Sequence, residues 1–223
     1  MTHAPSLPWG VLSDMDGTLL DTESTWLRVV ERFVFHHDGT DAAGLAAASE
    51  GLDLDRAAVL LRERLDLVAA PADIAADLDR RALAAYADAV SWTPGAPELL
   101  RALVDADVPL ALVTSSPRHW VDGFAQRVDL SAFRAVVTAD DTARTKPAPD
   151  PYLDGAAALG LPAARCVAIE DSLVGAWSAV SAGCVTVVVG DLARSLPPGV
   201  HRVASLTEVD VPMLRRIAGR EGS

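Results

Sequence analysis

The chain has 223 residues, of which 50% are hydrophobic, and carries a formal net charge of −12 at pH 7. This length and composition suit one well-buried core with a modest second module. The negative charge disfavours binding to nucleic acid and to anionic membrane surfaces. No run approaches the roughly 20 apolar residues that cross a bilayer, and the first residues lack a secretory-signal layout. We therefore expect a cytoplasmic protein that binds neither nucleic acid nor a membrane, as a monomer or a weak homodimer.

Short apolar runs alternate with helical patterns along most of the chain. The segments between the runs place apolar residues three and four apart, as amphipathic helices do. Strand and helix in repeated alternation predict an α/β fold of the Rossmann-like type, a parallel sheet with helices on both faces. The predicted strands are residues 9–13, 108–115, 135–139, 166–169 and 185–189.

Three helix starts support this alternation. Ser116 and Asp150 each precede a proline, which predicts an N-cap side chain followed by proline at the first helical position. Ser172 is the predicted N-cap of a third helix, which Gly183 ends. In open parallel sheets, ligands bind beyond the carboxyl ends of the strands, close to such helix starts.

One interval interrupts the alternation. Residues 14–107 contain no strand pattern, whereas a crossover needs only about a dozen residues. We predict an inserted α-helical cap at residues 22–91, within a core made of residues 1–21 and 92–223. Two apolar stripes, with a further helical segment at 55–65 between them, carry this prediction: Trp26, Val29, Val30, Phe33 and Val34, then Ile74, Leu78, Ala82, Ala85 and Ala89.

Two aspartates follow the first predicted strand. Residues two apart on a strand point to the same side, so Asp14 and Asp16 face one spot. Two close carboxylates repel each other unless a cation lies between them, and hard oxygen ligands suit Mg²⁺. Gly17 permits a tight turn that would leave N–H groups free for an anion. A calcium-binding loop fits poorly, because such a loop has its glycine at the sixth position, whereas Gly17 is at the fourth position counted from Asp14. A solvated acidic turn is the other alternative.

Polar residues follow other predicted strands as well. Thr114 and Ser115 end the second strand, where hydroxyls and free N–H groups could face a phosphate oxygen. Glu170 and Asp171 follow an apolar strand and could supply further metal ligands, although helix capping competes for Asp171.

The basic residues are almost all arginine rather than lysine. Lys146 is the only lysine, and arginine makes up the rest of the 19 basic residues. A lysine acts as a compact point charge toward phosphate, so a phosphate-binding role is the functional interpretation. Chance survival of one surface lysine is the alternative.

Four segments in this order resemble the haloacid dehalogenase superfamily, in its β-phosphoglucomutase-like branch with a helical cap. They are DMDGTLLD at residues 14–21, LVTS at 112–115, KPAPD at 146–150 and IEDS at 169–172, followed by Gly175 and Gly183. The resemblance spans nearly the whole chain. The tryptophan after DTE looks most like the sugar phosphatases of the 2-deoxyglucose-6-phosphatase kind.

The resemblance implies roles for the residues at matching positions. Asp14 would be the nucleophile that forms an aspartyl-phosphate, and Asp16 would protonate the leaving alcohol and then activate water. Thr114 and Lys146 would hold the phosphoryl oxygens. The implied metal ligands for Mg²⁺ are Asp14, Asp16 through its backbone carbonyl, Asp171 and Glu170, and the candidate substrate-binding residues are Gly17, Thr18, Ser115 and Trp26.

Two residues separate the possible reactions. Asp16 suits a leaving alkoxide that needs a proton, which argues against dehalogenation. Trp26 stands where the mutases carry a histidine, although it also fits as a core residue on its helical stripe. We predict a Mg²⁺-dependent phosphatase of a small phosphorylated metabolite, with sugar phosphates as the first choice. The alternatives are a phosphosugar mutase and a catalytically silent protein that binds a phosphorylated metabolite.

Overall fold

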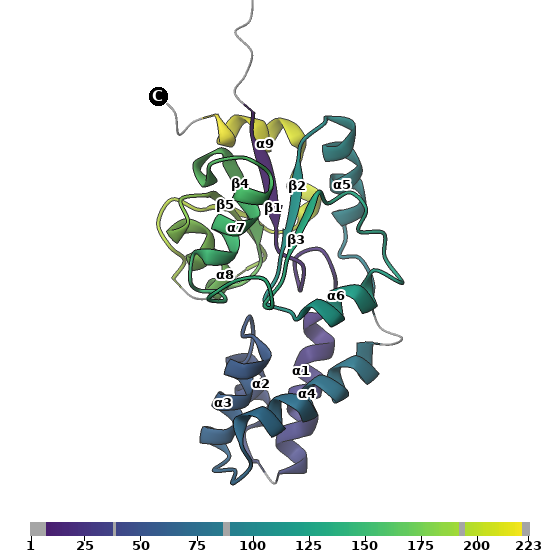
Figure 1. Ribbon diagram of the computed structural model, residues 1–223, viewed down its shortest axis with the longest axis vertical. Coiled ribbons are helices and arrows are strands. Elements are labelled where there is room, and N and C mark those ends of the chain that lie inside the picture. Colours follow the sequence, from purple (N-terminus) through teal and green to yellow (C-terminus); the bar gives the residue numbers. More distant parts are fainter. Residues whose placement is uncertain (1–7, 38, 87–89, 192–194, 220–223) are drawn as a thin grey trace, which may run out of the picture.

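The computed structural model describes residues 8–37, 39–86, 90–191 and 195–219. A six-stranded parallel sheet forms the centre of the upper part (Figure 1), in the order β3-β2-β1-β4-β5-β6. The strands are β1 (Gly10–Ser13), β2 (Leu110–Val113), β3 (Ala135–Val137), β4 (Cys166–Glu170), β5 (Val185–Val189) and β6 (His201–Val203).

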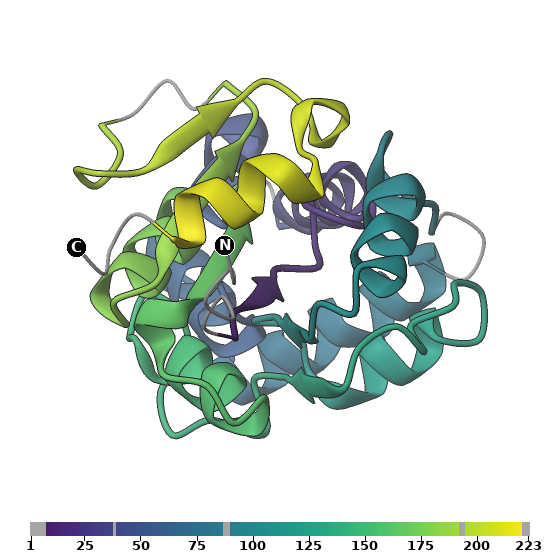
Figure 2. The same cartoon turned by 90° about the horizontal axis from the view of Figure 1, so that it is seen from above.

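Helices cover both faces of the sheet because consecutive strand residues point to opposite sides. Val11 packs in the cluster that includes residues of α5 (Ala96–Asp105) and α9 (Val211–Ala218), whereas Leu12 packs in the cluster with residues of α7 (Asp150–Ala158) and α8 (Leu173–Ser181). Figure 2, a view from above, shows α7 and α8 in green on one side and α9 in yellow on the other. The predicted α/β fold is confirmed.

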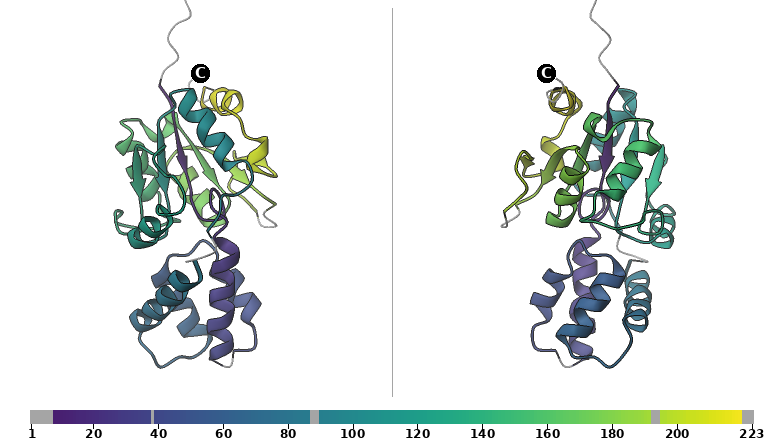
Figure 3. Two further views of the ribbon diagram at one scale, coloured as in Figure 1. Left: turned by 90° about the vertical axis from the view of Figure 1, so that its right-hand side faces the viewer. Right: turned by 60° about the vertical axis from the view of Figure 1, so that its left-hand side comes forward.

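The insertion between β1 and β2 is helical, as the two apolar stripes predict. It contains α1 (Glu23–His36), α2 (Ala42–Ala48), α3 (Leu54–Arg64) and α4 (Pro71–Tyr86). These four helices pack together below the carboxyl edge of the sheet (Figure 3). The stripe residues of α1 are buried, and so are Ile74, Leu78 and Ala82 of α4, while Ala89 lies outside the described residues.

Two segments connect the helical insertion to the sheet, and they lie side by side. Thr93 donates its backbone N–H to Leu19 at 2.8 Å, and Asp21 donates to Ser91 at 2.9 Å. The boundaries that we propose, after residue 21 and before residue 92, fall within this paired stretch. Within the described ranges, no helix combines the length and apolar character needed to span a membrane.

The structure corrects two helix starts and adds one strand. Pro117 and Pro149 occupy the N-cap positions of α6 (Arg118–Phe124) and α7 without side-chain capping bonds, so the predicted caps Ser116 and Asp150 were wrong. Ser172 does cap α8, accepting from the Gly175 N–H at 3.0 Å. Strand β6 was not predicted because three residues with one exposed member give too short a pattern.

Candidate active site

The carboxyl ends of the central strands bring four predicted site residues together. Because Ser13 pairs in register with Leu112 of β2 and with Ile169 of β4, the chain leaves all three strands at one edge. The Asp14 N–H extends this pairing by donating to the Ile169 carbonyl at 2.9 Å. Asp14, Thr114 and Asp171 therefore lie near one another, and Lys146 reaches the same edge from the segment before α7.

Asp14 is a buried carboxylate with one free oxygen. Its Oδ1 accepts from Lys146 Nζ at 2.5 Å, whereas its buried Oδ2 has no hydrogen-bond partner among the described atoms. Burial raises the pKa of Asp14 to about 7; the Lys146 ammonium opposes this shift, and the Glu170 and Asp16 carboxylates add to it. A buried oxygen without a donor is costly, so Asp14 is suited to bind a ligand or a cation there.

Lys146 is enclosed, with a relative exposure of 3%. Its ammonium donates to Asp14, to Glu170 Oε1 at 2.6 Å and to the Val113 carbonyl at 3.0 Å. Burial alone would lower the pKa of Lys146, but the two carboxylates outweigh it and raise that pKa above its ordinary value. Lys146 therefore stays charged. Its three protons already have acceptors within the protein, and the sequence did not predict these acceptors.

Glu170 anchors this lysine from below. Besides Lys146, its Oε1 accepts from the Tyr152 hydroxyl at 2.6 Å, and its Oε2 accepts from Ser172 Oγ at 3.0 Å. A side chain at Gly175 would collide with it, because a Cβ there would lie 1.9 Å from Glu170 Oε1. The buried Glu170 thus depends on Gly175 for space, and sequence reasoning missed its contact with Tyr152.

Three hydroxyls hold the carboxylate of Asp16. Thr22 donates to Oδ1 at 2.7 Å, and Thr114 and Ser116 each donate to Oδ2 at 2.8 Å. Thr114 also accepts from the Ser116 N–H at 2.9 Å, so its hydroxyl faces Asp16 rather than open space. Ser116 was expected only as a helix cap, and the contacts of Thr22 and Ser116 with Asp16 were not predicted.

A neighbouring group of acids could hold a metal ion. Asp14, Glu170 and Asp171 each offer a carboxylate oxygen, and these atoms lie within 4.8 Å of one another. The oxygen donors and the unpartnered Asp14 Oδ2 fit a hard divalent cation such as Mg²⁺. The Asp16 side chain is not part of this group.

Gly17 and Thr18 pack against Asp171 instead of facing the cavity in front of Asp14. Gly17 has a φ of +77°, and a Cβ there would lie 1.9 Å from Asp171 Oδ2. Its N–H donates to the Leu20 carbonyl at 2.8 Å, so this donor is already in use. Thr18 donates to Asp171 Oδ1 at 3.2 Å. Both residues line a separate hollow with Thr93 and Pro94.

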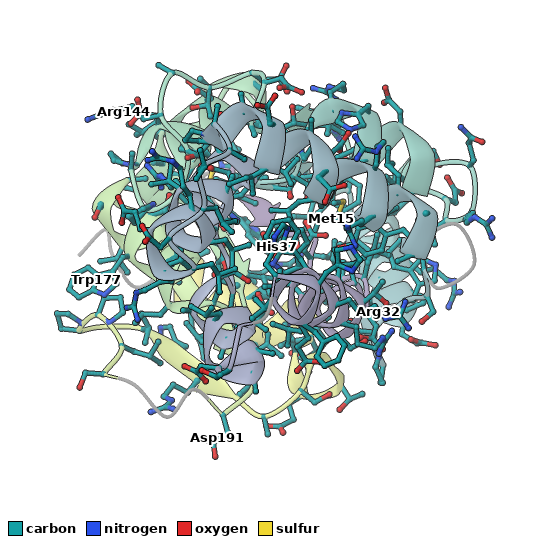
Figure 4. The ribbon with its side chains drawn as sticks, turned by 90° about the horizontal axis from the view of Figure 1, so that it is seen from below. Met15, Arg32, His37, Arg144, Trp177 and Asp191 are labelled. Carbon is teal, nitrogen blue, oxygen red and sulfur yellow. The ribbon has the colours of Figure 1, made fainter. Side chains whose placement is uncertain are left out.

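A cavity lies between the sheet edge and the helical insertion, with about 620 Å³ of empty space that is partly open to solvent. Asp14, Asp16, Ser115 and Lys146 line its sheet side, where the buried Ser115 hydroxyl has no partner within the described chain. Seen from the cap side, Met15, which follows Asp14, lies near the centre of the molecule, and Arg144 lies at the rim (Figure 4).

Aromatic rings form the opposite wall of this cavity. Trp26 of α1, Tyr86 at the end of α4 and Trp120 of α6 line it, with ring centroids 5.9 Å apart for Trp26 and Trp120 and 5.3 Å for Tyr86 and Trp120. Trp26 is 7% exposed, so it is at once a core residue and a wall residue. Tyr86 and Trp120 were not predicted, because they come from distant parts of the chain.

The start of α3 fastens the insertion to the segment that carries Lys146. Arg56 donates to the Lys146 carbonyl, and the Thr145 hydroxyl donates to Asp53 Oδ2. Asp53 also caps α3 by accepting from the Arg56 N–H at 2.8 Å. Arg56 therefore contacts the sheet part of the molecule through a backbone carbonyl, outside the cavity.

Comparison with known proteins identifies the family. The family model for haloacid dehalogenase-like hydrolases matches residues 10–183. Hexitol phosphatase A of Escherichia coli (strain K12) is 33% identical over 182 residues, which cover 81% of this chain and 82% of that protein. Validoxylamine A 7′-phosphate phosphatase of Streptomyces hygroscopicus subsp. limoneus is 30% identical over 210 residues, covering 90% and 95% of the two chains.

A solved structure shares the fold. β-Phosphoglucomutase from Clostridium difficile superimposes with a TM-score of 0.82 at 15% sequence identity, covering 95% of this chain and 97% of that one. The matched family model spans all four motifs and the helical insertion, which confirms the family predicted from those motifs. The chain is therefore an enzyme of the haloacid dehalogenase-like hydrolase family, with the β-phosphoglucomutase-like fold.

Proposed function

We propose that this enzyme is a Mg²⁺-dependent phosphatase that hydrolyses a small phosphorylated metabolite, with sugar phosphates as the leading class. The observation that carries the proposal is the unpartnered, buried Oδ2 of Asp14 at the floor of the cavity. Two relatives at or above 30% identity are named as phosphatases, of a hexitol phosphate and of validoxylamine A 7′-phosphate, which supports the same reaction class.

In the first step, Asp14 Oδ2 attacks the phosphorus atom and the ester P–O bond breaks. Asp16 gives its proton to the departing alkoxide, so the alcohol leaves neutral and Asp14 carries the phosphoryl group. In the second step, Asp16 takes a proton from the attacking water, the acyl-phosphate bond breaks, and inorganic phosphate leaves. The three hydroxyls on Asp16 keep its carboxyl group in position through both proton transfers.

Charge balance supports a role for a cation. Three acidic side chains, those of Asp14, Glu170 and Asp171, gather beside one ammonium group. A phosphate dianion would be repelled from this site without additional positive charge. Mg²⁺, when bound, would neutralise charge on the phosphoryl oxygens.

We infer that Asp14 and Asp171 would hold this ion, with the Asp16 backbone carbonyl beside them. Glu170 lies within reach of the ion, but its oxygens already accept from Lys146, Tyr152 and Ser172, so we assign it the task of anchoring Lys146. Ser115, whose buried hydroxyl has no partner, is the side-chain donor that we assign to the phosphoryl oxygens.

A phosphosugar mutase gains no separate support. In that reading Trp26 would replace the histidine of the mutases, and an indole ring cannot exchange protons as an imidazole does. The test is phosphate release from a panel of phosphate monoesters, with excess Mg²⁺ and with excess chelator. We expect release only with Mg²⁺; undiminished release in chelator would refute the proposal, and an isomerised sugar phosphate without free phosphate would identify a mutase.

A further inference from the structure

The cavity differs sharply in charge between its inner and outer ends. Among the described residues that line it, Lys146 is the sole cation, and its three protons are bound by Asp14, Glu170 and the Val113 carbonyl. The rest of the lining includes apolar residues and the loop after α2 with Glu50. No described cation therefore faces the part of a substrate that lies beyond the phosphate.

We propose that this cavity selects phosphate monoesters whose alcohol part carries no second anion, and that Glu50 and the aromatic wall enforce this choice. Neutral polyol phosphates and amino-sugar or amino-cyclitol phosphates fit the description, whereas bisphosphates and phosphorylated carboxylic acids do not. The inference rests on the proposed phosphatase function and specifies its substrate class.

Arg56 of α3 contacts the segment that carries Lys146, but it does not line the cavity. Its guanidinium binds the Lys146 carbonyl and lies 3.6 Å from Asp53 Oδ2. It lines a different hollow, together with Arg144 and Asp140. A second phosphate or a carboxylate inside the cavity would therefore lose its hydration without gaining a cationic partner, which is costly.

Glu50 adds a repulsive charge at the same place. It is exposed but lines the cavity, and the next residue, Gly51, approaches the sheet side closely. Gly51 has a φ of +70°, and a Cβ there would lie 3.3 Å from the Cβ of Ser172. The loop therefore runs close to Ser172, and Glu50 lines the cavity next to it. A negative charge there repels an anionic group and attracts a cationic one.

The aromatic wall favours the same ligands. The faces of Trp and Tyr rings pack against the C–H faces of sugar-like rings and attract cations. The same faces carry negative partial charge, so they do not attract an anion. Trp120 is held in place because its Nε1 donates to Asp79 Oδ1 at 2.6 Å. Leu52 and Leu54 complete this side of the cavity without adding a donor side chain.

The experiment compares matched phosphate esters by kcat/KM for phosphate release in Mg²⁺. Glucitol 6-phosphate and 6-phosphogluconate share an open chain and differ in a terminal hydroxymethyl or carboxylate group. Glucose 6-phosphate and glucosamine 6-phosphate differ in one amino group. Phosphoglycolate and fructose 1,6-bisphosphate are two further test substrates, which carry a carboxylate and a second phosphate, respectively. We expect the anionic members to fall below their partners by about tenfold or more, as a desolvated charge without a partner requires.

Two outcomes overturn the inference, and they are distinguishable. If a carboxylate-bearing ester or a bisphosphate is the best substrate, the selection rule is wrong while the phosphatase function stands. If no ester in the panel releases phosphate, the proposed function itself fails and this inference fails with it.

Variants of Glu50 test the mechanism of selection. Glu50→Lys should narrow the ratio of kcat/KM between glucitol 6-phosphate and 6-phosphogluconate by about tenfold, and Glu50→Gln by about threefold. Glu63→Gln, a change of the same charge on the exposed side of α3 and outside the cavity, is the control and should leave the ratio unaltered. An unaltered ratio in Glu50→Lys would remove Glu50 from the explanation.

Discussion

The two walls of the cavity are built on opposite principles. On the sheet side, Asp14, Asp16 and Lys146 sit in a buried network in which nearly every polar atom has a fixed partner. The opposite wall combines aromatic rings from the insertion and from α6 with the loop after α2, where Glu50 is exposed. Under the proposed function, the reaction would depend on groups held at strand ends, and the choice of substrate would depend on the shape and charge of the opposite wall.

The variant with the largest expected effect is Asp14→Asn, which changes the sheet side of the cavity. The amide keeps the size of the side chain but cannot form a stable acyl-phosphate, so phosphate release should fall by at least about a thousandfold for every substrate. A cap change such as Glu50→Gln should instead shift substrates relative to one another. Phosphate release by Asp14→Asn within tenfold of the wild-type rate would remove Asp14 from the reaction.

The packing around Glu170 can be tested with a pair of glycine substitutions. Gly175→Ala places a methyl group against Glu170 and should lower the free energy of unfolding by about 2 kcal/mol. It should also reduce phosphate release, because a displaced Glu170 would no longer hold Lys146 in position. Gly123→Ala on α6 has no atom within 4 Å of its new Cβ and should be neutral or stabilising by up to about 1 kcal/mol. Denaturant unfolding measures both. Equal stabilities of the two variants would contradict the described packing.

The pKa of Asp14 predicts a pH-dependent stability difference. In metal-free protein the folded-state value of about 7, against 3.8 for the ordinary carboxyl, means that the native state holds a proton that the unfolded chain has lost between these pH values. Rising pH in this window should destabilise the wild type but not Asp14→Asn. The stability advantage of the variant should grow by about 2 kcal/mol from about pH 5 to pH 7 and then level off.

Chemical denaturation of both proteins across this pH range, in chelator, checks the prediction. Added Mg²⁺ should stabilise the wild type and have a much smaller effect on Asp14→Asn. An advantage that shrinks as the pH rises would have the wrong sign and would contradict the raised pKa of the buried Asp14 carboxyl.

The contact between α3 and the Lys146 segment connects the helical insertion to the sheet part of the molecule. Arg56→Ala removes the donor to the Lys146 carbonyl and should lower kcat/KM by about fivefold with little change in thermal stability. Arg62→Ala, an exposed arginine on the same helix, is the matched control. Identical kinetics of the two variants would show that this contact does not position Lys146.

The sequence predicts the sheet side far better than the cap side, for a physical reason. Asp14, Lys146 and Asp171 follow strands or sit in short motifs, and parallel strands bring their carboxyl ends to one edge whatever the rest of the chain does. The hydroxyls of Thr22 and Ser116 escaped prediction because their contact with Asp16 depends on how two loops fold back.

Of the aromatic wall, only Trp26 was among the predicted candidates. Tyr86 and Trp120 were not predicted, because they come from different parts of the chain and meet only in the folded molecule. Helical periodicity indicates that such rings are buried, but it does not show that they also line a cavity. The bond from the Gly17 N–H to Leu20 is a further case, since a glycine after the aspartate pair indicates a turn without showing which carbonyl accepts that N–H.

The central claim is that Asp14 takes the phosphoryl group during turnover. Mass spectrometry of wild-type enzyme, acid-quenched during turnover of its best phosphate ester in Mg²⁺, tests this most directly. The account predicts one added phosphoryl group on the peptide that contains residue 14, and none in Asp14→Asn treated in the same way. A phosphoryl group found on any other residue, or an equal amount in the variant, would contradict it.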